Sequence, residues 1–379
     1  MTIIRVEAMN IHYTSVMVRD NEGHSHPGKP HDGKMPFLCI TCDDGTKGYS
    51  IGGRMDVDVL NKIVAPALIG TDPFMIQQTW QRMRTWQRLH PSFTGRSLCA
   101  MDNALWDICG KKCGQPVYKL LGGYREKVAA YASIMTGDDL EGGLNSPKAY
   151  ADFAAKLVKQ GYKAIKLHTW MPPTIPEPNP KLDVTACRMV REAVGPDVEL
   201  MLDPYHDYSR EQALYIAKEL EKLNFLWLEE PMDENSIASY QWLSQKTNLS
   251  LCGPETAEGK SQNRCMWAVS GAADIGRAGT EDQGGITSVI KTAHMYEAFG
   301  MSVELHGGTI GNLHVLGAIP NGKYYERGML HPLLDYEKPK PWFKSIYDPI
   351  DANGLVGIPQ APGLGWDFNM DYINANRLE

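Results

Sequence analysis

The sequence predicts an α/β protein in which a closed (β/α) barrel follows a smaller α+β domain. Between about residues 128 and 330 the chain repeats one unit, a short apolar strand followed by an amphipathic helix. Strands that alternate with helices pair in parallel, so the sheet is either a closed barrel or an open, doubly wound sheet. An open sheet that binds a nucleotide would carry a signature such as G-x-G-x-x-G, and the sequence has none.

The length of the chain sets the domain boundaries, because a barrel of the TIM type typically takes about 250 residues. The front domain, with predicted strands in TIIRVEAMN and FLCITCDDGTKGYS, is placed at residues 1–125. Glycines and charges interrupt the apolar pattern at LLGGYREK, and the barrel is placed after it, at residues 126–335. Residues 336–379 remain as a C-terminal segment.

Three barrel helices carry start signals and apolar faces. In SPKAYADFAAKLVKQG, Ser146 and Pro147 suit the N-cap and the first turn. In SREQALYIAKELEKLN, Ser209 and Gln212 are spaced as a capping box. The segment GGITSVIKTAHMYEAFG has apolar residues at helical spacing. The apolar strands YKAIKLH, FLWLEE and SVELH follow these helices, as a (β/α) repeat requires.

Polar residues stand at the carboxyl ends of the predicted strands, where barrels carry their chemistry. Asp203, Glu229 and Glu255 end three successive strands at equal spacings of 26 residues. Three carboxylates at one end of a barrel repel one another unless a divalent cation lies between them, and oxygen ligands of this kind favour Mg²⁺. Each acid could instead cap a helix or pair with a lysine, but this is a poor explanation of all three together. The other strand-end residues are Lys166, His168, Arg277 and His306.

These residues carry a resemblance to a known family. The series KAIKLH, LMLDPY, WLEEP, CGPET, GGIT and LHGG resembles the enolase superfamily, in particular its mandelate racemase and muconate lactonizing branch. MDNALWDICGKKCGQPVYKLLGG resembles the helix and linker between that family's N-terminal capping domain and its barrel, and PGLGWDFNMDYI resembles the C-terminal segment that returns to the cap. The resemblance implies that Asp203, Glu229 and Glu255 ligate Mg²⁺, with Glu230 as a supporting acid.

The family's chemistry is abstraction of the proton α to a carboxylate, which gives an enediolate stabilised by Mg²⁺. Such a weak carbon acid needs this stabilisation before a lysine or histidine can act as base. Lys166 is the matching lysine on the second barrel strand, and we expect a neighbouring cation and partial burial to lower its pKa. His168 points to the same side of the strand and is expected to orient Lys166 or to contact the substrate carboxylate.

His306 matches a family histidine that serves as base or acid after the seventh strand. In relatives an aspartate at the end of the sixth strand pairs with it, and the matching position here is Gly279. Without that partner the tautomer and basicity of the imidazole are unsecured, so we expect His306 to act as an acid. Glu304, on the same strand as His306, is the first candidate for a substitute partner, and Glu281 and Asp282 are nearby in the loop.

Three further residues are expected to bind substrate. Glu326 matches a family glutamate that hydrogen-bonds the substrate carboxylate. The segment GHSHPGKPHDGK, with His24, His26 and His31, is predicted to be a loop that acts as a lid over the barrel, since its irregular histidine spacing argues against a metal site. Arg54, in the second capping segment GGRMD, is expected to hold a distal anionic or hydroxyl group.

Composition excludes several classes of protein. The formal net charge is −7 and no basic stripe interleaved with aromatic residues is present, so we expect no nucleic-acid partner. No apolar run approaches the roughly 20 residues that a membrane helix needs, and the first residues do not resemble a signal peptide, so we expect a cytoplasmic protein without a membrane partner. The eight cysteines are scattered in apolar surroundings and are expected to be reduced.

The leading hypothesis is Mg²⁺-dependent dehydration of an acid sugar to a 2-keto-3-deoxy acid, with Lys166 as base and His306 as the acid that assists departure of the β-hydroxyl. A racemase, an epimerase or a cycloisomerase acting on a hydroxy acid is the first alternative. From another class, the chain could be a catalytically silent homologue that binds sugar acids. The expected partners are a small-molecule carboxylate and further copies of the chain in a homo-oligomer.

Overall fold

The computed structural model describes residues 1–21, 23–172, 174–255, 257 and 260–378. In this part of the chain, eight parallel strands form a ring that closes where β11 pairs with β4. The predicted (β/α) barrel is therefore confirmed. Its strands are β4 (Lys127–Ile134), β5 (Ala164–His168), β6 (Glu199–Asp203), β7 (Trp227–Glu229), β8 (Ser250–Cys252), β9 (Ile275–Ala278), β10 (Ser302–Leu305) and β11 (Tyr324–Leu330).

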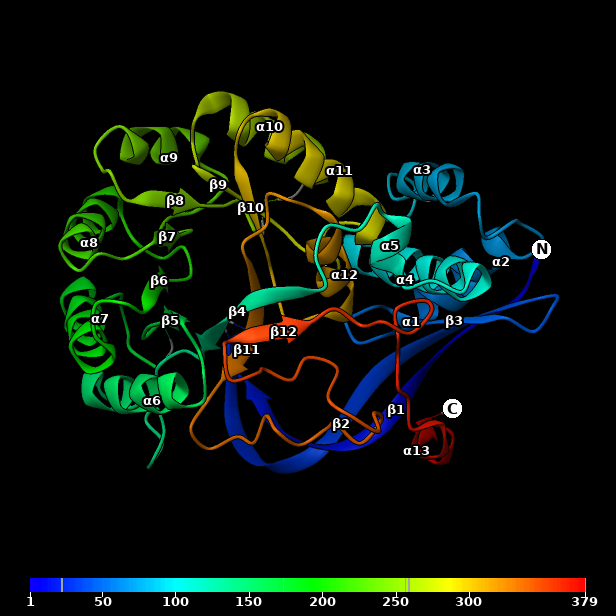
Figure 1. Ribbon diagram of the computed structural model, residues 1–379, viewed down its shortest axis with the longest axis horizontal. Helices are drawn as coiled ribbons and strands as arrows, with labels where there is room; N and C mark the ends of the chain where they lie inside the picture. The colour runs from blue at the N-terminus through cyan, green and yellow to red at the C-terminus, as the bar shows by residue number, and fades with distance from the viewer. Residues whose placement is uncertain (22, 173, 256, 258–259, 379) are drawn as a thin grey trace.

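The barrel helices cover the outside of this ring (Figure 1). The first begins as predicted, because the Ser146 side chain accepts a hydrogen bond from the backbone N–H of Ala149. The helix that begins at Arg210 carries the predicted capping box, in which the side chains of Ser209 and Gln212 each form a hydrogen bond with the backbone N–H of the other. The helices are α6 (Pro147–Lys159), α7 (Pro180–Val194), α8 (Arg210–Lys222), α9 (Ile237–Ser244), α10 (Lys260–Ser270), α11 (Gly285–Ala298) and α12 (Ile310–Ala318).

Beside the barrel lies an antiparallel sheet in the order β13, β1, β2, β3, with helices packed on it (Figure 1). Its strands are β1 (Ile3–Arg19), β2 (Ser25–Cys42), β3 (Lys47–Ile51) and β13 (Arg377–Leu378). The helical segments are α1 (Val57–Val59), the π-helical turn η1 (Leu60–Val64), α2 (Ala65–Leu68), α3 (Ile76–Trp86), α4 (Gly95–Cys113) and α5 (Val117–Leu120).

The prediction of a loop over GHSHPGKPHDGK is wrong. From Ser25 onward this stretch belongs to β2, which pairs with β1 in a long hairpin that ends at the Arg19 and Ser25 pair. Two prolines are tolerated there because β3 pairs only with Phe37–Thr41, so this part of β2 has one free edge. The histidines consequently have fixed positions on the hairpin.

The end of the chain joins both parts of the fold. Strand β12 (Leu355–Gly357) pairs antiparallel with β4 of the barrel. After α13 (Met370–Ala375), β13 adds to the edge of β1, where Leu378 lies opposite Asn10. Across the described residues, no helix is long and apolar enough to cross a membrane.

Helices α3 and α4 fix the loop between β9 and α11. The Trp80 side chain donates to the carbonyl oxygen of Gly284, and Asp102 accepts from the backbone N–H of Thr287 at 2.8 Å. Gly285 has a φ of 81°, and a Cβ there would lie 2.5 Å from the Asp102 side chain, so no larger residue fits. The loop that precedes this contact is thereby held against the front part of the molecule.

Candidate active site

A cavity of about 1110 Å³ lies at the carboxyl ends of the barrel strands, with residues of the β1–β2 hairpin along its other side. Glu229 is more deeply buried and does not line it. The other residues proposed from the sequence as catalytic, metal-binding or substrate-binding do line it: His24, Arg54, Lys166, His168, Asp203, Glu255, His306 and Glu326. The structure thus brings together side chains from both ends of the sequence.

Three carboxylates converge below this cavity. Asp203 and Glu229 are the last residues of β6 and β7, and Glu255 follows the end of β8 by three positions. One oxygen atom from each lies within 4.8 Å of the others, and Glu229 is only 1% exposed. A set of three carboxylate oxygens open to a cavity fits a hard divalent cation such as Mg²⁺. Parallel strands place their ends at one rim of the barrel, which explains why the regular spacing in the sequence becomes proximity.

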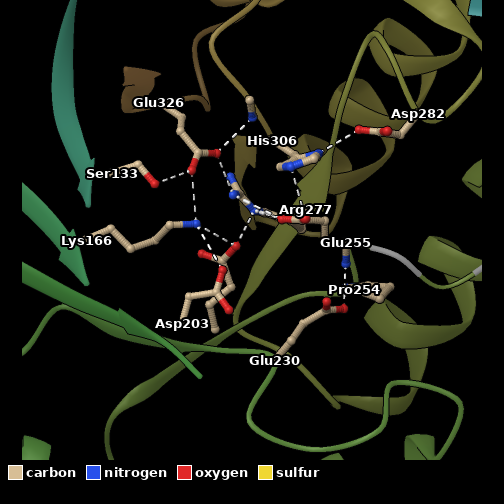
Figure 2. A network of polar contacts seen from close by, with 12 residues as sticks. Ser133, Lys166, Asp203, Glu230, Pro254, Glu255, Arg277, Asp282, His306 and Glu326 are labelled. Carbon is tan, nitrogen blue, oxygen red and sulfur yellow. Dashed lines mark hydrogen bonds and ion pairs between the residues drawn. The ribbon is translucent and has the colours of Figure 1, made fainter. Parts of the chain in front are cut away.

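Lys166 contacts three carboxylates, of which Asp203 and Glu326 are labelled in Figure 2. Its Nζ lies 3.0 Å from Glu229 and 3.2 Å from Asp203 and from Glu326. Burial by itself lowers the pKa of Lys166, but Glu229 and Glu326 outweigh it and hold that pKa well above its ordinary value. The expected lowering is therefore not what this arrangement produces. The expectation assumed a cation on these oxygens, and here the ammonium itself pairs with them.

Arg277, on β9, is the residue at the centre of the cluster that sequence reasoning left without a role. Its guanidinium is fully buried and lies 2.7 Å from Glu229, 2.8 Å from Glu326 and 3.1 Å from Glu255. An arginine can hold several carboxylates at once because its donors form a planar fork. Its position at a strand end, like that of the three acids, was the available signal.

The pKa values of Glu255 and Glu326 are shifted in opposite directions. Burial raises the pKa of Glu255 to about 8, and the nearby His306 and Arg277 oppose this increase only in part. Burial also acts to raise the pKa of Glu326, but Lys166 and Arg277 hold it well below its ordinary value. Glu326 is further bonded by the Ser133 hydroxyl and the Gly307 backbone N–H, each at 2.8 Å. It is a fixed negative charge at the cavity floor.

His306 has a carboxylate partner after all. Its Nδ1 lies 2.6 Å from Asp282 and its Nε2 lies 3.1 Å from Glu255, as Figure 2 shows. Burial lowers the pKa of the imidazole, but Glu255 and Asp282 raise it to about 10. Asp282 comes from the loop after β9, three positions beyond Gly279, and Arg96 lies 3.5 Å from its other oxygen.

The expectation that Glu304 would be the first substitute is wrong. Its carboxylate accepts hydrogen bonds from the backbone N–H groups of Lys323 and Tyr324, at 3.3 and 3.1 Å, away from His306. At Gly279 a Cβ would lie 3.0 Å from Asp282 and 3.2 Å from the His306 carbonyl oxygen. An aspartate at that position would therefore compete with Asp282 for space.

Two supporting residues hold the acids in place. His168 donates from Nδ1 to the carbonyl oxygen of Ile134 at 2.6 Å, and its Nε2 lies 3.1 Å from Asp203. Glu230 accepts a hydrogen bond from the backbone N–H of Glu255 at 2.6 Å, which fixes the chain that carries that acid. The second glutamate of the FLWLEE strand is thus paired with backbone at the barrel rim.

The hairpin side of the cavity presents His24. Its Nδ1 lies 3.2 Å from Asp20, and His26 lies 2.8 Å from the same carboxylate. The His24 ring meets the edge of Tyr205 at 4.5 Å between centroids, and Tyr205 in turn packs on His168. A continuous contact therefore runs from the hairpin to the barrel floor.

A barrel rim with three carboxylates, a buried lysine and a carboxylate-paired histidine defines a metal-dependent enzyme. The family model described as "Enolase C-terminal domain-like" matches residues 149–372. A second, "Mandelate racemase / muconate lactonizing enzyme, N-terminal domain", matches residues 17–122. The chain belongs to the enolase superfamily, in its mandelate racemase and muconate lactonizing branch.

Its relatives include lyases and isomerases. The chain is 32% identical to an arabinonate dehydratase from Saccharolobus solfataricus. The match extends over 343 residues and covers 86% of each chain. It is 28% identical to a D-galactarolactone cycloisomerase from Agrobacterium fabrum, over 89% of this chain and 90% of that one. A crystal structure of D-glucarate dehydratase from Agrobacterium tumefaciens complexed with magnesium matches with a TM-score of 0.97, 48% identity and full coverage of both chains. The protein is thus an enzyme of the lyase or isomerase type.

Proposed function

We propose that this enzyme catalyses the Mg²⁺-dependent dehydration of an acid sugar to a 2-keto-3-deoxy acid. The observation that carries the proposal is the placement of two proton-transfer groups on different sides of one carboxylate cluster. Figure 2 shows Lys166 on one side and His306, with Glu255 beside it, on the other, and the Arg277 guanidinium between them. Dehydration needs this pair, because one proton must leave the α-carbon and another must reach the departing hydroxyl group.

Each residue then has a defined task. Lys166 is held as an ammonium by Glu229 and Glu326 in this arrangement, and it becomes a base when the carboxylates beside it are engaged by Mg²⁺ instead. The neutral amine then takes the α-proton, and the electron pair left on the α-carbon forms the double bond as the β-hydroxyl departs. His306, flanked by two carboxylates, gives its proton to that hydroxyl, which leaves as water. The resulting enol takes up a proton at the β-carbon and loses the proton of its hydroxyl group, which gives the 2-keto-3-deoxy acid, so the overall loss is one water molecule.

The metal site and the floor of the cavity support this chemistry. Asp203, Glu229 and Glu255 would hold Mg²⁺, which when bound supplies positive charge to the substrate carboxylate as negative charge develops there. Arg277 keeps Glu229 and Glu326 in fixed positions through contacts of 2.7 and 2.8 Å. A preorganised site needs no rearrangement of its charges during the reaction.

The names of the relatives support dehydration and also keep one alternative open. Arabinonate and D-glucarate dehydratases act on acid sugars by name, whereas D-galactarolactone cycloisomerase is an isomerase. The contact between His306 and Asp282 favours a racemase or cycloisomerase as the second candidate, because a carboxylate-paired histidine can also serve as a base. The hypothesis of a catalytically silent binder depends on His306 having no carboxylate partner, and its contact with Asp282 removes that reason.

The reaction assay separates these outcomes. The enzyme with Mg²⁺ is incubated in D₂O with a library of acid sugars, and products are followed by a 2-keto acid reagent and by NMR. The expected result is formation of a 2-keto-3-deoxy product with Mg²⁺ and no product when excess EDTA is present. Deuterium uptake without loss of water would indicate a racemase or epimerase, and a rearranged lactone a cycloisomerase. Substrate binding with neither change would contradict catalysis.

Mg²⁺ is expected to raise the melting temperature of the protein. A ligand that binds only the folded state stabilises it by about 2.7 kcal/mol at 100 times its Kd, which for a chain of this size corresponds to roughly 3 to 6 °C. Scanning fluorimetry measures the shift. The Glu255→Gln variant should lose it, whereas Glu192→Gln, at an exposed position on α7, should keep it. An equal shift in both variants would contradict the assigned ligands.

A further inference from the structure

Three arginines gather at the end of the cavity that the front part of the molecule covers. Arg19 is the last residue of β1, Arg54 lies in the turn after β3, and Arg96 is in the first turn of α4. All three line the same cavity as the catalytic candidates. They come from three separate elements, so the fold and not local sequence brings them together.

Among the described residues, two of these guanidinium groups have no acidic partner. In the part of the chain that the structure describes, Arg96 contacts Asp282 at 3.5 Å, whereas the side chains of Arg19 and Arg54 make no hydrogen bond or ion pair. Burial lowers the pKa of Arg54, and the nearby Arg19 and Arg96 lower it further. Arg19 and Arg54 are exposed at the mouth of the cavity, and their charges are close enough to act on one another, so both guanidinium groups are available to an anion that enters it.

The nearest acids do not serve as that anion. Asp282 is already shared by His306 and Arg96. Glu281 makes no ion pair among the described residues, and burial followed by the charge of Asp282 raises its pKa to about 7, so it is partly neutral near that pH. Arg19 and Arg54 therefore keep their positive charges unpaired beside these acids.

Arg54 lines the cavity from a turn whose backbone is strained. Gly52, Gly53 and Arg54 have φ values of 80°, 64° and 51°, three successive residues in the left-handed region. Arginine rarely adopts this conformation, and such strain is retained where the surrounding structure and function demand it. A turn built only to connect β3 to α1 would not need an arginine at this position.

We infer that the substrate is an acid sugar with an anionic group at each end, a dicarboxylate, whose distal carboxylate is bound by Arg19 and Arg54. This inference rests on the proposed function, which places the reacting carboxylate at Asp203, Glu229 and Glu255. A guanidinium group matches a carboxylate because two parallel N–H donors meet two oxygens. A monocarboxylic sugar acid would instead place a neutral hydroxyl group against two unpaired arginines, which is a weaker interaction.

Three probes that differ only at C6 test the inference. D-glucarate carries a carboxylate there, D-gluconate a hydroxymethyl group and 6-phospho-D-gluconate a phosphate, and the same comparison is repeated in the galacto series. We expect kcat/KM for the dicarboxylate to exceed that for the monocarboxylate by roughly 10- to 100-fold, as expected for a charge-assisted hydrogen-bonded pair. A higher kcat/KM for 6-phospho-D-gluconate than for D-glucarate would show that the arginines bind a phosphate and not a carboxylate, and would overturn the inference.

Variants locate the effect. Arg54→Met and Arg19→Met should each lower the ratio of kcat/KM for dicarboxylate over monocarboxylate by roughly 10-fold or more, and Arg54→Lys should restore part of it. Arg188→Met, at an exposed position on α7 outside the cavity, should leave the ratio unchanged. Equal turnover of both acids, with equal losses in the Arg54→Met variant, would overturn the inference and leave the proposed function standing.

A failure of the proposed function has a different signature. If no acid in the panel is turned over, binding of D-glucarate and D-gluconate to the Mg²⁺-loaded protein is measured by calorimetry. Tighter binding of the dicarboxylate that is lost in Arg54→Met would support the arginine site without the reaction. Equal binding of the two acids would overturn the arginine site as well.

Discussion

Replacement of Lys166 by alanine will abolish exchange of the substrate's α-proton with solvent, together with formation of the 2-keto acid. A positioned general base contributes roughly 10²- to 10⁴-fold, and Lys166 is the amine that the structure buries at the carboxylate cluster, 1% exposed. The measurement is deuterium incorporation at the α-carbon in D₂O, followed by NMR. Because alanine also removes a partner of Glu229 and Glu326, the melting temperature is recorded alongside.

Two further variants give this result its meaning. His306→Asn should lose dehydration, since hydroxide leaves poorly without a proton donor, yet keep some α-exchange through Lys166. Lys163→Ala, at an exposed position shortly before β5, should behave as the unmodified enzyme. If His306→Asn loses exchange while Lys166→Ala retains it, the histidine is the base and the enzyme resembles the second candidate function.

The sequence could predict the residues whose positions follow from topology. Once the strands are assigned to a parallel barrel, residues at their carboxyl ends must meet at one rim, and this applies to Lys166, Asp203, Glu229 and Glu255. The helix starts at Ser146 and Ser209 follow from local hydrogen bonds that a short sequence window contains. Neither kind of inference requires knowledge of how distant segments pack.

The sequence could not predict contacts that depend on the path of a loop or on packing between distant elements. Asp282 lies three positions beyond Gly279, and its approach to His306 depends on how Trp80 and Asp102 hold the following loop and α11. The strand at Ser25 was hidden because proline and glycine usually mark turns, and only the free edge of β2 permits them there. The role of Arg277 required knowing which acids surround it.

The Asp282→Asn variant will lower dehydration by roughly 10²- to 10⁴-fold, because a general acid contributes about that much and loss of an orienting carboxylate can remove as much as about 10⁴-fold. The amide can still accept a hydrogen bond from Nδ1, but it no longer stabilises a protonated imidazole. The pH profile is the measurement that separates this from a structural defect. The limb that reports protonated His306 should move to lower pH, because Asp282 is one of the two carboxylates that raise its pKa to about 10.

Moving the carboxylate tests whether its charge or its exact point of attachment matters. Gly279→Asp alone should reduce activity, because a Cβ there would lie 3.0 Å from Asp282 and the two acids would repel each other. The double variant Gly279→Asp with Asp282→Gly removes that conflict and returns the acid to the position that relatives use. We expect it to recover part of the dehydration lost in Asp282→Gly alone. No recovery, together with an unchanged pH profile in Asp282→Asn, would show that Asp282 holds Arg96 or the loop and does not tune His306.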